Sequence, residues 1–101
     1  MTDGLPVVPP TPERVAAMVA GAGRPGSASL GDFPPLNAPA TVEKVAINAT
    51  MAGCAPRYMP LLLAAVDAFL DPVMNAHAIQ TTTNPVSPML VVNGPIRQRL
   101  A

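Results

Sequence analysis

Prolines and glycines restrict the fold of this chain more than any other feature of its sequence. The 101 residues include fourteen prolines and seven glycines, and these cluster between segments with apolar residues at helical spacing. A proline fixes its own φ and moves the preceding residue out of the helical region. The pattern therefore predicts short elements joined by extended segments, within a single domain over residues 1–101.

Three helices are predicted where a start signal precedes apolar residues at helical spacing. The start signals are Thr11-Pro12, Thr41 and Pro56. The corresponding spans are 12–21, 42–52 and 56–70, ending at glycines for the first two helices and at Asp71-Pro72 for the third. Residues 23–40, with four prolines, are predicted to be a long linker that only Leu30, Phe33 and Leu36 could attach to a core.

Two strands are predicted near the C-terminus. Residues 77–83 are rich in β-branched side chains, and residues 89–93 form an apolar run between turn signals. Because an isolated two-stranded unit is marginal, we expect residues 5–8 or another chain to add a strand. The predicted fold is therefore α+β, with three helices packed on a small β-sheet that is incomplete without a partner or further sequence.

Charge and composition exclude some classes of function. The formal net charge is zero and the six cationic residues are scattered, whereas phosphate binding needs a basic patch. The most apolar stretch, residues 59–70, is about half of the roughly 20 residues that a bilayer span needs. We therefore predict no nucleic-acid partner and no membrane segment. A single cysteine and an N-terminus without signal-peptide features predict a cytoplasmic protein.

Cys54, the only cysteine, lies two residues before the predicted start of the third helix. Unpaired amides at a helix start stabilise an anion, and Arg57 adds a positive charge, so this thiol is a candidate nucleophile. The alternative is that Cys54 is a small apolar residue of the core. His77, the only histidine, would complete the minimum pair for nucleophilic catalysis if the two side chains meet. One cysteine and one histidine are too few for a zinc site, so no metal is predicted.

Amide and hydroxyl groups gather at the ends of the two predicted strands. They suit a neutral or carbonyl-bearing ligand, because loops at strand ends often hold ligands. Turn formation is the competing interpretation, since Asn-Pro and Asn-Gly start turns whether or not a ligand is present. The predicted ligand-binding residues are Arg57, Thr83, Asn84, Asn93 and Gly94.

Three stretches together resemble a known family. They are DGLPVVPPTPERVAAM (3–18), TVEKVAINATMAGCAPRYMPLLLAAVDAF (41–69) and QTTTNPVSPMLVVNGPIR (80–97). They are similar to a region of the UGSC family of bacterial proteins, which is named for a selenocysteine- or cysteine-containing Gly-Ser-Cys motif. The resemblance implies a two-part protein whose redox motif belongs to another segment. This chain contains no such motif, so we expect a companion module, a subunit or a truncated piece.

The leading functional hypothesis is a companion module of a bacterial thiol- or selenol-linked enzyme system, with Cys54 contributing to a shared site. Its partner would be a second copy or a protein that supplies the missing domain. The alternative is a non-catalytic module that binds a small molecule or a protein. The substrate is not determined by the sequence, and no cofactor is indicated.

Overall fold

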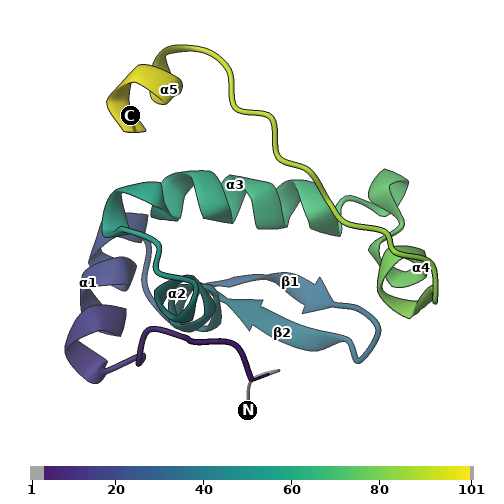
Figure 1. Ribbon diagram of the computed structural model, residues 1–101, viewed down its shortest axis with the longest axis horizontal. Helices are drawn as coiled ribbons and strands as arrows, with labels where there is room; N and C mark the ends of the chain where they lie inside the picture. The colour runs from purple at the N-terminus through teal and green to yellow at the C-terminus, as the bar shows by residue number, and fades with distance from the viewer. Residues whose placement is uncertain (1–3, 101) are drawn as a thin grey trace.

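The computed structural model describes residues 4–100, and Figure 1 shows their arrangement. The fold is α+β, as predicted. In chain order the elements are α1 (Pro12–Ala22), β1 (Ser29–Phe33), β2 (Ala38–Thr41), α2 (Val42–Met51), the 3₁₀-helix η1 (Pro56–Tyr58), α3 (Met59–Leu70), the 3₁₀-helix η2 (Pro72–Met74), α4 (Ala76–Thr81) and α5 (Pro95–Leu100).

The three predicted helices are confirmed, and they surround one apolar core. Val42 and Met59 are fully buried, with 0% of their surface exposed. Met18 and Ala22 of α1 and Ala46 and Ala49 of α2 lie on the apolar faces expected from helical spacing, and α3 adds Leu63 to the core. Thr41 caps α2 as predicted, because its hydroxyl accepts a hydrogen bond from the Lys44 amide at 3.2 Å, whereas Thr11 is the N-cap residue of α1 without a side-chain cap bond.

A close approach between α1 and η1 depends on a glycine. A Cβ placed on Gly21 would overlap the carbonyl oxygen of Pro56. The absent side chain therefore lets the last turn of α1 lie directly against the backbone that begins η1. This contact fixes the position of the segment that contains Cys54.

The predicted strands are wrong. Residues 76–81 form α4, in which Asn75 acts as the N-cap and its side chain accepts from the Ala78 amide at 3.4 Å. The Thr81 hydroxyl donates to the His77 carbonyl at 2.9 Å, so this β-branched residue is accommodated by a bond within the helix. Residues 82–94, named the C-terminal strap below, have no regular secondary structure.

The sheet forms instead within the segment predicted to be a linker. β1 and β2 pair as an antiparallel hairpin, with Ser29 opposite Thr41 and Phe33 opposite Ala38. Two of the three residues expected to attach this segment do so: Leu30 packs against the core cluster, and Phe33 stacks on Phe69 with ring centroids 5.4 Å apart. Leu36 is exposed. Tertiary contacts with α3 therefore hold a sheet that strand propensity does not predict.

Residues 5–8 do not add a strand to this sheet. In the extended N-terminal segment, the Val8 amide donates to the Met51 carbonyl at 3.1 Å, at the end of α2. The segment therefore lies against the helical core (Figure 1).

The C-terminal strap leads from α4 to α5 along the side of α3 that faces away from the hairpin in Figure 1. Its large apolar side chains are exposed, including Met89 at 84% and Val91 at 68%. The Tyr58 hydroxyl donates to the Leu100 carbonyl at 3.3 Å and so connects α5 to the start of α3.

No single helix within residues 4–100 has the length and hydropathy for a membrane span. The pair Pro56–Leu70 and Pro72–Thr81 passes that test only when joined, and it is bent by 68°.

Candidate functional site

Cys54 is held by the backbone at the C-terminal end of α2. The Gly53 amide donates to the Thr50 carbonyl at 2.9 Å, and the Cys54 amide donates to the Ala49 carbonyl at 2.9 Å. With Gly53 at φ 78°, these two bonds form a Schellman motif. Cys54 occupies the last position of that motif and packs, half-buried, against the core cluster. Its location is therefore fixed by how α2 ends.

Cys54 also lies two residues before the helical segment that starts at Pro56, as predicted. The electrostatic setting is more balanced than the sequence indicated, because the carbonyl end of α2 and the amide end of η1 both lie next to this residue. Pro56 has no N–H group, and the Tyr58 amide donates to the Ala55 carbonyl at 2.9 Å. Few amides at this helix start are left to bind an anion.

A hollow of about 260 Å³ opens beside Cys54 between α1, the end of α2 and the extended N-terminal segment. Apolar groups form most of its wall, and three residues add polar atoms or a charge. The lining residues are Val8, Arg14, Ala17, Met18, Thr50, Gly53, Cys54 and Pro56. Cys54 and Arg14 therefore line the same apolar depression.

Arg14 and Thr50 were not predicted as site residues. Thr50 is 4% exposed, and its hydroxyl already donates to the Ala46 carbonyl at 2.8 Å. Arg14 donates through Nη1 to the Pro9 carbonyl at 3.1 Å, and its side chain is exposed. Helical spacing places Arg14 on the same face of α1 as Ala17 and Met18, but it does not show that this face meets the end of α2.

Arg57 is not part of this hollow. Its guanidinium lies 5.0 Å from the centroid of the Tyr58 ring, and its Nη2 donates to the Tyr58 hydroxyl at 3.2 Å. Arg57 therefore belongs to a cation–π contact at the start of α3, near α5. The cation that lines the hollow with Cys54 is Arg14.

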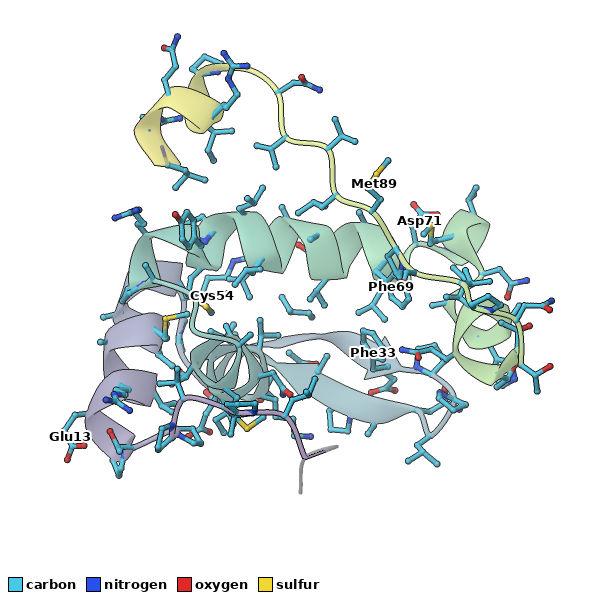
Figure 2. The ribbon with its side chains drawn as sticks, viewed as in Figure 1. Glu13, Phe33, Cys54, Phe69, Asp71 and Met89 are labelled. Carbon is cyan, nitrogen blue, oxygen red and sulfur yellow. The ribbon has the colours of Figure 1, made fainter. Side chains whose placement is uncertain are left out.

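The structure does not bring Cys54 and His77 together. Figure 2 shows Cys54 near the start of α3, whereas α4, which carries His77, lies beyond the other end of that helix. No other histidine exists in the sequence. Within the described residues there is no group of three or more histidine, cysteine, aspartate or glutamate side chains that could hold a metal ion.

The other four predicted ligand-binding residues lie at two separate places in the structure. Thr83 and Asn84 follow α4, where the Asn84 amide donates to the Thr82 hydroxyl at 3.1 Å and the Asn84 carbonyl accepts from Val86 at 2.8 Å. These local hydrogen bonds form a turn, in agreement with the competing interpretation. Asn93 and Gly94 line a separate open hollow of about 370 Å³ before α5. Neither pair lines the hollow that contains Cys54.

Known proteins do not resolve the function of this site: no family model, curated protein or solved structure matches the chain. The resemblance to the UGSC family therefore stays a prediction.

Chemically, the hollow offers one thiol and one fixed positive charge on an apolar wall. Arginine is always protonated and cannot accept a proton, and Thr50 is already committed to a backbone carbonyl. The residues that line the hollow therefore include no general base that could deprotonate the Cys54 thiol.

Proposed function

We propose that this chain is a companion module that contributes Cys54 to a shared site of a bacterial thiol- or selenol-linked enzyme system. The observation that carries the proposal is the half-buried Cys54 thiol in the same apolar hollow as Arg14. Support also comes from the resemblance of three stretches of this chain to the UGSC family. A cytoplasmic location, where a single thiol stays reduced, forms part of the proposal.

The lining of the hollow is the reason that the proposal includes a partner. A thiol reacts as its thiolate, and a proton acceptor within hydrogen-bond reach is one way to form it. No lining residue of this chain fills that role, and His77 lies on α4 at the other end of α3. In the proposed assembly the partner supplies the base, while Arg14 stabilises negative charge on the bound substrate.

A non-catalytic binding module is the second candidate. An apolar wall with one exposed guanidinium suits a small molecule that has an apolar body and a single anionic group. In that function Cys54 serves only as a small apolar residue, in keeping with its contacts with the core cluster.

The alkylation rate of Cys54 tests accessibility and charge together. The native chain is treated with neutral iodoacetamide and with anionic iodoacetate, and each rate is divided by that of the chain in denaturant. The companion-module proposal expects native rates comparable to the unfolded rates. It also expects Arg14→Gln to slow iodoacetate several-fold more than iodoacetamide, because the guanidinium attracts the carboxylate of the reagent.

Arg24→Gln is the matched control, because Arg24 is exposed just beyond α1 and does not line the hollow. It should leave the ratio of the two rates unchanged. A thiol that is protected in the native chain and reacts only in denaturant would reject a site role for Cys54. Cys54→Ser then distinguishes the candidates, since a binding module keeps its ligand affinity and an enzyme subunit loses turnover with its partner.

A further inference from the structure

The C-terminal strap combines exposed apolar side chains with an unpaired backbone. Met89, Leu90 and Val91 are 84%, 55% and 68% exposed. Within the described part of the chain, the amides and carbonyls of residues 87–93 make no hydrogen bond to another residue. Such a segment resembles the edge of a sheet, where free donors and acceptors can pair with another strand.

Side chains on both faces of the strap are open to contact. Met89, Leu90, Val91 and Asn93 are exposed, and among residues 89–93 only Val92 is half-buried. Because successive side chains of an extended chain lie on opposite faces, another chain could reach apolar groups on either face of the strap.

The strap and the residues next to it carry no acidic, lysine or arginine side chain. Residues 72–96 contain no aspartate, glutamate, lysine or arginine. Natural proteins protect exposed strand edges with charges, bulges or a covering element. An uncharged, apolar and unpaired edge is therefore suited to being covered in an assembly.

We propose that residues 89–93 pair antiparallel with the same residues of a second copy of this chain. The pairing is isologous about a two-fold axis at Val91, so that Val91 lies opposite Val91, Leu90 opposite Val92 and Met89 opposite Asn93. Pro88 and Pro95, which have no N–H group, limit the ladder at both ends.

Two observations favour a second copy in this orientation. The formal net charge of the chain is zero, so two copies meet without net repulsion. Arg97 and Arg99 follow the strap, and a parallel pair would place these cations of the two copies side by side. Antiparallel pairing instead places them at opposite ends of the ribbon.

The two paired straps would also cover a surface of the molecule, namely the side of α3 that faces away from the hairpin. One side of α3 holds the hairpin through Phe33 and Phe69, whereas Met89 lies beside the C-terminal half of α3 on its other side (Figure 2). Leu61 and Ala65 of α3 are only half-buried. A two-stranded ribbon over them would complete a second layer on this helix, which a two-stranded unit needs for stability.

Pairing through residues 89–93 names the surface by which the partner of the proposed function binds. It rests on the proposed function only because that function requires a partner. The sedimentation test leaves Cys54 untouched, so the two proposals can fail separately. Sedimentation across a concentration series measures dimerisation of the full chain. Val91→Lys places two like charges opposite each other and should raise the dimer dissociation constant by at least about tenfold.

Val73→Lys is the control, because Val73 is 94% exposed outside the strap and should leave the dissociation constant unchanged. Circular dichroism verifies that both variants fold. A chain that is monomeric at every concentration overturns the proposal. So does a dimer that Val91→Lys does not weaken, since another surface, or another protein, would then be the partner.

Cross-linking tests the register. In a Cys54→Ser background, Val91→Cys places two thiols opposite each other, with Cα atoms about 4.5–5.5 Å apart, which is within disulfide range. Mild oxidation should link Val91→Cys dimers faster than Met89→Cys dimers, because Met89 faces Asn93 of the other copy. Faster linking through position 89 would overturn the register at Val91.

Discussion

Two methionines show how differently the two parts of this molecule are built. Met59, in the helical core, is 0% exposed, whereas Met89, in the C-terminal strap, is 84% exposed. Both lie in strongly apolar stretches, MPLLLAAV and PMLVV. Apolar composition therefore does not decide burial here. What differs is the number of elements around each residue, because α1, α2 and η1 enclose the start of α3, and no element within residues 4–100 covers the outer side of the strap.

This difference assigns separate tasks to the two parts. The core positions Cys54, through the end of α2 and the contact between Gly21 and Pro56. The strap presents apolar surface and free backbone groups, which are features of an interaction surface. Mutations in the core should therefore change stability, and mutations in the strap should change association.

The largest expected effect contrasts the two methionines directly. Met59→Ala should lower the free energy of unfolding by about 2–5 kcal/mol, because it removes a fully buried side chain and leaves a cavity. Met89→Ala should change it by less than about 0.5 kcal/mol in the monomer. Urea unfolding of dilute protein measures both, and equal losses would show that the strap is part of the core.

A second prediction concerns whether a substitution inside α1 raises or lowers the free energy of unfolding. Glycine to alanine normally stabilises a helix by roughly 1 kcal/mol. Gly21→Ala should instead destabilise the chain by about 1–3 kcal/mol, because the new Cβ overlaps the Pro56 carbonyl oxygen. It should also change the native alkylation rate of Cys54. Stabilisation on urea unfolding would contradict the close approach of α1 and η1.

Gly23→Ala is the matched control, since Gly23 has φ 64° and no atom lies within 4 Å of a Cβ placed there. Only backbone strain opposes this substitution. It should therefore be destabilising without moving the segment that holds Cys54, and its alkylation rate should equal that of the unchanged chain.

The sequence predicted the buried faces of α1 and α2 well because their signals are local. Thr41 and Gly53 mark the two ends of α2, and the spacing of Val42, Ala46 and Ala49 marks its buried face. These positions follow from helix geometry alone. The location of Cys54 before a helical segment was predicted for the same reason.

The hairpin and the strap depend on contacts between distant residues, so the sequence did not predict them. β1 is held by Phe33 on Phe69, and Leu70 lies close to Gly31, which has φ 135° and where a Cβ would lie 3.2 Å from the Leu70 Cδ1. The run of β-branched residues after His77 indicates a strand, but Asn75 caps a helix at this point through the Ala78 amide. Arg14 entered the candidate site through tertiary contact between α1 and the end of α2, which spacing on one helix cannot reveal.

A third, smaller prediction compares two threonines. Thr41→Ala should lower the free energy of unfolding by about 1 kcal/mol, because the Thr41 hydroxyl caps α2 through the Lys44 amide. Thr82→Ala removes a similar bond, to the Asn84 amide, but in the exposed strap. Thr82→Ala should change the free energy of unfolding by no more than about 0.5 kcal/mol. Thermal unfolding of the two variants checks this, and a larger loss from Thr82→Ala would contradict the contrast.

The smallest expected effect is a pH dependence at the exposed start of α1. A backbone hydrogen bond, followed by one from the Thr11 side chain, lowers the pKa of Glu13 from its usual 4.5. Both bonds favour the charged carboxylate. A lowered pKa in the folded state contributes stability above the unfolded value, and this contribution is lost as the pH falls through the folded pKa.

Glu13→Gln should therefore reduce stability slightly at neutral pH and flatten its decline below pH 4.5, so that the two curves converge in acid. Thr11→Ala removes the second hydrogen bond, so its curve of stability against pH should lie between those of the original chain and Glu13→Gln. Urea unfolding across this pH range, with the Glu13 carboxyl titrated by NMR, measures the change. Parallel curves for the original chain and Glu13→Gln would show that this carboxylate does not stabilise α1, and the acid sensitivity would then belong to other carboxylates in the chain.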